Sequence, residues 1–139
     1  MSTFGRLAET SAGLERRLGR SLEQHCEIPH SWFEVLVRIS RTDGGLVSMG
    51  ALAEQLVLTS GGVTRLVDRM SETGYVERLP CPSDRRVNYV ALTDAGRAKL
   101  DEALEVHRGN LREAFATLGD AEVATLDILL DRLRSADRP

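Results

Sequence analysis

The sequence predicts a mainly α-helical protein with a small β-hairpin wing (α+β), a winged helix-turn-helix with further helices at both ends. Residues 59–70, TSGGVTRLVDRM, have the pattern of an amphipathic helix whose first turn is small and polar. Residues 83–96, SDRRVNYVALTDAG, describe a charged hairpin tip, a strand with alternating apolar residues and a helix start. A helix able to enter a groove, followed by an arginine-tipped hairpin, is typical of this fold class.

Length and composition fit one globular domain. The chain has 139 residues, 42% hydrophobic and 28% charged, so we expect a single domain over residues 1–139. No uncharged run exceeds ten residues and the N-terminus lacks a signal-peptide pattern, so we expect a cytoplasmic protein that does not bind membranes. The net charge of −3 excludes a strongly basic DNA-coating protein, although residues 60–92 carry five arginines against four acidic residues.

Two helices are expected in the N-terminal third. Residues 3–25 place leucines on a narrow stripe, which is closer to a coiled-coil seam than to a wide core face. After Pro29, Ser31 and Glu34 match a capping box for the next helix. That helix is apolar over much of its surface, so we expect it at the centre of the core.

Two short helices joined by a tight turn should follow. Ser48 is placed to cap a helix that runs to about Gln55. Thr59 or Ser60 caps the next helix, and Gly74 ends it at a position where a left-handed residue is often needed. This pair is the predicted helix-turn-helix.

The hairpin and two more helices complete the chain. Strand character covers residues 75–79 and 87–92, and the prolines between them indicate a loop instead of a two-residue turn. Thr93 should cap a helix to about Leu118, and Asp120 should cap the last one. Both helices carry an apolar stripe. The stripe of the first helix consists of Leu100, Leu104, His107, Leu111 and Leu118. The stripe of the second helix consists of Val123, Leu126, Leu129, Leu130 and Leu133.

The terminal helices predict an oligomer. Residues from about 30 to 92 make up the winged helix-turn-helix, whereas residues 1–25 and 93–139 are helical segments with stripes suited to packing on other helices. One small domain has little core left to receive these stripes. Packing across a two-fold axis would bury them, so we expect an obligate homodimer with dimerisation helices at both ends.

The second helix of the pair carries residues suited to reading base edges. Ser60, Gly61 and Gly62 allow its first turn to approach the floor of a major groove closely. Thr64 can hydrogen-bond a base or place its methyl against a thymine, and Arg65 can bind either a guanine or a phosphate. On the helix alone, a solvated face would be the better interpretation. The hairpin that follows at the expected distance favours double-stranded DNA.

Backbone and minor-groove contacts are expected from the surrounding residues. Arg69 lies one turn further along and is more suited to a phosphate, and Ser48 can bind phosphate at a helix N-terminus. Arg85 and Arg86 sit at the hairpin tip, where they can reach a narrow minor groove. Asp84 is too close to be a phosphate ligand, and we expect it to hold Arg86 through an ion pair.

The residues around the hairpin resemble the MarR family of bacterial transcription regulators. The most specific mark of that family is Asp-x-Arg-x-x-x-Val-x-Leu-Thr-x-x-Gly, filled here by Asp84, Arg86, Val90, Leu92, Thr93 and Gly96. The resemblance implies a homodimer on a pseudo-palindromic operator, with Arg86 as the wing arginine and Asp84 as its partner. It also implies a repressor that a small, often phenolic or drug-like ligand releases from DNA.

The resemblance places an effector pocket between the dimer helices and the reading head. Here His30 and Trp32 are the candidates to line it. Cys26 does not lie at the family's usual sensing place, and Cys81 lies beside the wing, where oxidation or alkylation could disturb DNA contact. We interpret both thiols as incidental. The three histidines show no metal-ligand spacing, so we expect no metal and no cofactor.

Two other function classes fit the sequence less well than a DNA-binding regulator. No nucleophile triad, phosphate loop or metal motif is visible, so we do not expect an enzyme. A winged module that binds a protein partner and has lost DNA binding is compatible with the mild net acidity. The arginines at positions 65, 85 and 86 argue against it.

Overall fold

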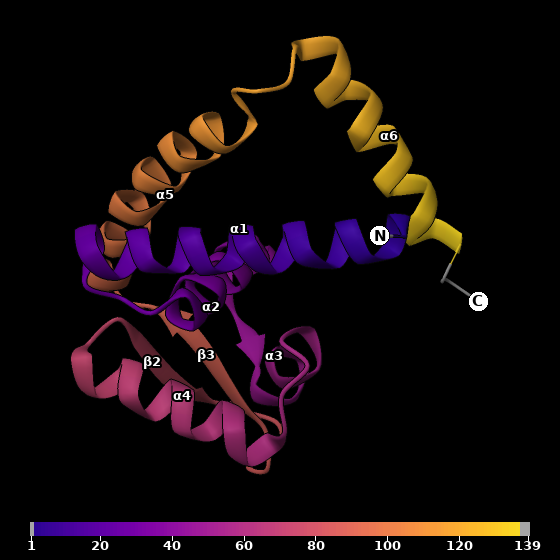
Figure 1. Ribbon diagram of the computed structural model, residues 1–139. Helices are drawn as coiled ribbons and strands as arrows, with labels where there is room; N and C mark the ends of the chain where they lie inside the picture. The colour runs from indigo at the N-terminus through magenta and orange to yellow at the C-terminus, as the bar shows by residue number, and fades with distance from the viewer. Residues whose placement is uncertain (1, 137–139) are drawn as a thin grey trace. The chain divides into compact units, whose positions relative to one another are not determined.

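The computed structural model describes residues 2–136 (Figure 1). The helices are α1 (Thr3–Cys26), α2 (His30–Arg41), α3 (Met49–Gln55), α4 (Ser60–Thr73), α5 (Asp94–Phe115) and α6 (Asp120–Ala136), with a 3-10 turn η1 (Asp43–Gly45). The strands are β1 (Val47–Ser48), β2 (Val76–Pro80) and β3 (Asn88–Leu92). The mainly α-helical class with a β wing is therefore confirmed. No helix among the described residues is long and apolar enough to cross a membrane.

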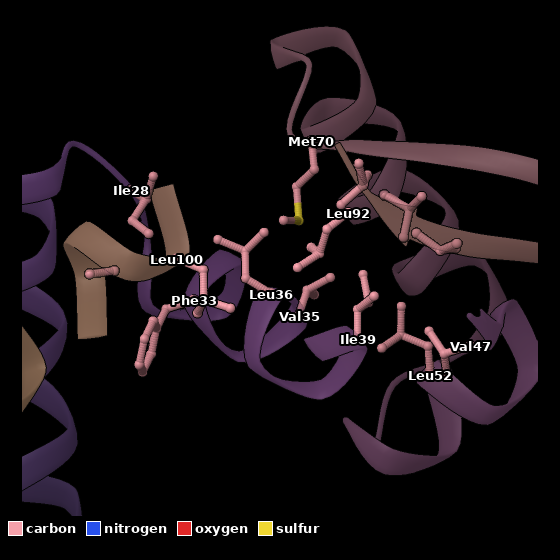
Figure 2. Close-up of a cluster of buried hydrophobic side chains, with 14 of the residues drawn as sticks. Ile28, Phe33, Val35, Leu36, Ile39, Val47, Leu52, Met70, Leu92 and Leu100 are labelled. Carbon is pink, nitrogen blue, oxygen red and sulfur yellow. The ribbon is translucent and has the colours of Figure 1, made fainter. Parts of the chain in front are cut away.

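The chain divides into two units within α5, one ending at His107 and the other beginning at Arg108. In the first unit, α2 lies at the centre of the hydrophobic core, as predicted (Figure 2). Val35, Leu36 and Ile39 of this helix have no exposed surface. Residues from α3, α4 and the sheet surround them, including Leu52, Val63, Val67, Met70 and Val90.

The predicted capping box of α2 is wrong. Pro29 occupies the N-cap with an extended backbone, and its carbonyl accepts from the amides of Trp32 and Phe33. The helix therefore begins at His30, which leaves Ser31 inside the first turn, and no side chain caps α2. Proline fixes its own φ near the value that precedes a helix, so the chain needs no polar side chain to start α2.

The predicted helix-turn-helix is confirmed in α3 and α4. Ser48 caps α3, its Oγ accepting from the amide of Ala51 at 3.1 Å. Of the two candidates for the cap of α4, Thr59 holds the position and accepts from the amide of Gly62 at 3.0 Å. Gly74 ends α4 with φ +89°, the left-handed conformation expected there.

The turn between α3 and α4 contains a valine in the left-handed region. The amide of Val57 donates to the Glu54 carbonyl at 3.2 Å, and the amide of Leu58 donates to the Ala53 carbonyl at 2.9 Å. These are the two bonds of a Schellman motif, in which Val57 takes the place usually held by glycine. Its φ is +55°, a conformation that costs an L-residue roughly 1–2 kcal/mol.

The wing is a three-stranded antiparallel sheet in the order β1-β3-β2. In the β2–β3 hairpin, Val76 pairs with Leu92 and Pro80 pairs with Asn88. The strands are shifted by about one residue from the prediction, because Val87 belongs to the loop and its amide donates to the Asp84 carbonyl.

The start of α5 is fixed against the end of α4. Thr93 caps α5 as predicted: its Oγ1 accepts from the amide of Gly96 at 3.0 Å and donates to the carbonyl of Gly74 at 2.5 Å. The Thr93 amide donates to the carbonyl of Tyr75 at 3.1 Å. A Cβ on Gly96 would lie 1.9 Å from that same Tyr75 oxygen, so only glycine fits at this position.

The second unit contains the last part of α5 and α6, and two predicted boundaries within it are wrong. α5 ends at Phe115 instead of Leu118, because the chain passes into three-residue turns before Gly119. α6 begins at Asp120, so the residue before the helix is Gly119, whose amide donates to the Glu122 carboxylate at 2.8 Å. The Glu122 side chain therefore caps the helix in place of the Asp120 side chain.

One face of α6 is apolar and exposed. None of its described residues is buried, and four large apolar side chains are 40% to 60% exposed, namely Ile128, Leu129, Leu130 and Leu133. Ile128, which is 57% exposed, lies outside the predicted stripe and about 160° around the helix from Leu130, so the exposed apolar side chains are not confined to the predicted face.

The close approach at Gly96 gives the first prediction. Gly96→Ala should lower the free energy of unfolding by roughly 3 kcal/mol, because the new methyl group would displace a backbone carbonyl instead of a flexible side chain. Urea unfolding followed by circular dichroism measures the change. Gly50→Ala is the control: nothing lies within 4 Å of its added Cβ, so this helical site should gain about 0.5 kcal/mol. Equal effects at the two sites would contradict the clash.

Candidate nucleic-acid interface

Helix α4 presents one face to the core and the other to solvent. Val63, Val67 and Met70 are buried, and they hold the helix against α2 and α3. On the opposite face, the predicted readers Thr64, Arg65 and Arg69 are exposed. Ser60 and Gly61 are also exposed, and Gly62 is half-buried beside its cap. The predicted residues of this helix therefore form one accessible surface, and their contacts with DNA stay a prediction.

An ion pair fixes α4 to the wing. Arg78 of β2 donates to Asp68 Oδ1 at 2.5 Å and to the carbonyl oxygen of Thr64 at 3.4 Å (Figure 1 shows the two elements). The side chains of Arg78 and Asp68 are 33% and 53% exposed, so the pair is worth about 1 kcal/mol or less in stability. Its effect is geometric, because it sets the position of α4 relative to the hairpin.

Sequence analysis did not identify this pair. From the sequence, Arg78 was only one of the five arginines counted in residues 60–92. It is ten positions from Asp68 along the chain. The available signal was the alternation of the strand, which puts Arg78 on the same side of the hairpin as the inward-facing Val76.

The wing tip is organised by Asp84. Its Oδ1 accepts from the backbone amide of Arg86 at 3.0 Å and lies 3.5 Å from the Arg86 Nε. The Arg86 side chain is nevertheless 93% exposed, and Arg85 is exposed beside it. The carboxylate thus forms the ion pair expected from the sequence and also closes the turn, while the guanidinium remains available to a partner.

This surface carries three arginines that form no ion pair among the described residues and one exposed acid of α4, Glu72. Within residues 2–136, no ion pair involves Arg65, Arg69 or Arg85, whereas Asp68 and Asp84 are both engaged by arginines. Ser48 is half-buried. Its Oγ accepts the hydrogen bond that caps α3, and its hydroxyl proton can still be donated to another acceptor. The acidic chain therefore carries a local cationic surface over α4 and the wing.

The two candidate pocket residues lie apart. His30 lines a cavity of about 280 Å³ between α2 and α5, together with Phe33, Glu34, Val37, Arg38, Arg41, Leu104 and His107. Trp32 does not line this cavity and instead packs edge-on against Tyr75, with ring centroids 6.1 Å apart. The helix rotates by about 100° per residue, which turns residues two apart toward different neighbours.

His107 is the polar group of this cavity that lacks a partner. Its Nδ1 is buried without a hydrogen bond among the described residues, and its ring packs on Phe33 at 4.9 Å. Burial lowers the pKa of the His107 imidazole, and the nearby His30 adds to the shift. The ring is therefore neutral at pH 7, with a nitrogen available to a bound molecule.

Neither thiol lies in this cavity. Cys26 is buried, and burial raises the pKa of its thiol, so it is held in the unreactive form. Cys81 lies in the wing loop with its Sγ 3.2 Å from the Ser83 hydroxyl, and that hydrogen bond lowers the pKa of the thiol. Among the described residues, no group of three or more His, Cys, Asp and Glu side chains is arranged to hold a metal ion.

The chain is similar to known transcription regulators. The model of the MarR family matches residues 27–87. The multiple antibiotic resistance protein MarR of Escherichia coli (strain K12) is 32% identical over 131 residues, which is 94% of this chain and 90% of that protein. The HTH-type transcriptional regulator PecS of Dickeya dadantii is 25% identical over 134 residues, covering 96% of this chain and 80% of PecS.

Solved structures with this architecture include complexes with DNA. Sco3205, a MarR family transcriptional regulator from Streptomyces coelicolor in complex with DNA, matches with a TM-score of 0.85 and 26% identity over 98% of this chain and 86% of that chain. A mutant MarR from E. coli complexed with operator DNA matches with a TM-score of 0.77 and 28% identity, over 96% and 99% of the two chains.

The wing tip gives the second prediction. In Asp84→Ala the Arg86 amide loses its acceptor, so hydrogen exchange at that amide should accelerate about fivefold, the equivalent of about 1 kcal/mol. Asp84→Asn keeps a side-chain oxygen and loses the charge, so it is the matched control and should retain most of the protection. Exchange is measured residue by residue by NMR. Equal acceleration in both variants would assign the ordering of the tip to the ion pair instead of the turn.

Proposed function

The chain belongs to the MarR family of DNA-binding transcriptional regulators, and we propose that it is a homodimeric repressor of a pseudo-palindromic operator. Proteins of this family are regulators and not enzymes. The observation that carries the proposal is the exposed face of α4, bearing Thr64, Arg65 and Arg69, held beside an arginine-tipped wing by the Arg78–Asp68 pair. Two such heads would read successive major grooves about 34 Å apart.

Each part of this surface suits a different contact. The small residues Ser60, Gly61 and Gly62 let the first turn of α4 approach the base edges, where Thr64 and Arg65 read sequence. Arg69 and Ser48 bind phosphates, which fix the register without reading sequence. Arg85 and Arg86 extend from the wing into the minor groove, where a narrow A·T-rich segment concentrates negative potential.

The proposed dimer uses the helices outside the reading head. Residues 30–92 form the DNA-binding part, and residues 1–25 and 93–139 form the dimerisation part. The exposed apolar face of α6 supports this division, and so do Phe4 and Leu7 near the start of α1, which are 78% and 42% exposed. Exposed apolar side chains grouped on helices mark surfaces that another protein covers.

We include a small-molecule effector in the proposal. The cavity beside His30 and His107 combines aromatic and aliphatic walls with two arginines, a lining suited to a small phenolic or drug-like molecule. Because the cavity touches both α2 and α5, an occupant there changes the packing between the core helix of the reading head and the helix that leaves it. That change would release the operator.

The third prediction concerns the wing arginine. Arg86→Ala should weaken operator binding by roughly 1–3 kcal/mol and reduce the slope of log affinity against log salt by about 1. The reason is the loss of one exposed guanidinium, which leaves the fold intact. Fluorescence anisotropy with DNA flanking the gene, over a salt series, measures both quantities. Arg97→Ala makes the same change in charge at an exposed site on α5 and should leave the affinity unchanged.

Other results of this titration separate the two function classes. Unchanged affinity in Arg86→Ala would remove the wing contact from the proposal. If the wild-type protein binds neither the flanking DNA nor duplexes offered in a random library, the reading head serves a protein partner instead.

The fourth prediction concerns the dimer. Leu133→Glu should raise the dissociation constant of the dimer roughly 1,000-fold, because a buried unpaired carboxylate costs about 2 kcal/mol in each of the two symmetric copies, about 4 kcal/mol in all. Leu133 is 60% exposed in the single chain, so the change does not disturb the core of the protomer. Sedimentation velocity measures the monomer fraction. Ala124→Glu, exposed on α6 outside the leucine stripe, is the control, and a stable dimer in Leu133→Glu would remove α6 from the interface.

A further inference from the structure

Val57 is the most exposed large apolar side chain of the reading head. It is 90% exposed, and it lies in the turn that joins α3 to α4. Its side chain therefore contributes almost nothing to the core of the protein. Leu58, which follows it, is 42% exposed.

The backbone at Val57 disfavours a valine. Its φ of +55° is imposed by the two hydrogen bonds that close the turn, from the amides of Val57 and Leu58. Glycine or asparagine adopts this conformation with less strain than a β-branched residue. Folding stability thus gives no reason for valine here, and a strained residue at the surface is a reason to look for a contact outside the chain.

The turn lies beside the N-terminal end of α4. Val57 precedes Thr59, the cap of α4, by two residues. The Cβ of Leu58 is 3.8 Å from the point where a Cβ on Gly62 would stand, so the turn packs directly beside the first turn of α4. The apolar pair Val57–Leu58 is therefore continuous with the small-residue surface that the proposed function directs into the major groove.

We propose that Val57 is a specificity-determining residue whose isopropyl group contacts the C5-methyl group of a thymine in each half-site. The proposal rests on the proposed DNA-binding function. Thymine is the base that offers an apolar group in the major groove, so an uncharged branched side chain at this edge distinguishes it from cytosine. Valine is well suited because its branches are held rigid at χ1 and lose little freedom on contact.

The test uses duplexes that the wild-type protein selects from a random-sequence library. Each thymine of the selected half-site is replaced in turn by deoxyuridine, which removes only the C5-methyl group. For the wild-type protein, replacing one thymine in one half-site should lower affinity about fourfold, the value of one buried methyl group, and the same replacement in both half-sites should lower it about 16-fold. Thymines outside the half-sites serve as the DNA control and should show no change.

The variants separate contact from fold. Val57→Asn keeps the left-handed turn and removes the apolar group, so it should bind thymine and deoxyuridine duplexes equally and with the lower affinity. Val57→Ile is the matched control and should keep the thymine preference. Urea unfolding provides the second readout: Val57→Gly should unfold at an equal or higher urea concentration than the wild type while losing the thymine preference.

Each outcome decides the proposal. A deoxyuridine effect that persists in Val57→Asn assigns the methyl contact to another residue and overturns the proposal. Equal affinity of wild type and Val57→Asn for every duplex does the same. If the wild-type protein selects no duplex at all, the proposed function fails first, and that result is distinct from a normal selection that is indifferent to position 57.

Discussion

The arrangement of the reading head depends on the junction where α4 ends and α5 begins. The carbonyls of Gly74 and Tyr75 have no helical partners, and both are satisfied by Thr93, through its hydroxyl and its amide. Gly96 then brings the first turn of α5 against the Tyr75 carbonyl, at a distance that no side chain tolerates. One threonine and one glycine thereby fix the recognition helix, the hairpin and α5 to one another. The Leu-Thr-x-x-Gly part of the motif contains the two residues that form this junction, Thr93 and Gly96.

The surface charge follows from where the acidic residues are used. The chain has a net charge of −3, which alone opposes binding to a polyanion. Around α4 and the wing, however, Asp68 and Asp84 are both paired with arginines, and Glu72 is the exposed acid that remains on α4. No ion pair among the described residues involves Arg65, Arg69 or Arg85, so their charges can attract a partner. Over distances beyond the Debye length of about 8 Å, the acids elsewhere are screened and the local field decides binding.

Much of the fold could be predicted because its signals are local. Ser48, Gly74 and Thr93 sit at helix ends whose backbone groups need a cap, and the structure confirms all three. Predictions failed where a neighbour supplied the same function, as Pro29 does for α2 and Gly119 with Glu122 do for α6. The Arg78–Asp68 pair and the Gly96 contact join segments distant in sequence, so local patterns could indicate the residues but not which partners they meet. The strain at Val57 was equally hidden, because it depends on φ.

The candidate site was predicted less completely than the fold, because the direction in which each side chain points depends on how the helices pack. Residue types and spacing identified the exposed arginines, because exposed positions on an amphipathic helix follow from its period. The lining of a cavity depends instead on how two helices rotate against each other. His30 faces the cavity with His107, whereas Trp32, only two residues away, packs on Tyr75. A polar atom left unpaired inside, the Nδ1 of His107, is visible only after packing is known.

α5 connects the two functions of the molecule through a single continuous helix. It begins at the Thr93 junction, buries Leu100 and Ala103 in the core of the reading head, and continues past His107 into the second unit. The cavity meets α5 at Leu104 and His107, the last turn of the helix that belongs to the first unit. The proposed ligand would act on α5 between its start, which Thr93 fixes, and the part of the helix that belongs to the second unit. In the proposed dimer, the spacing of the two reading heads would depend on this segment of α5. The proposed effector would therefore need no contact with α4 or the wing to alter operator binding.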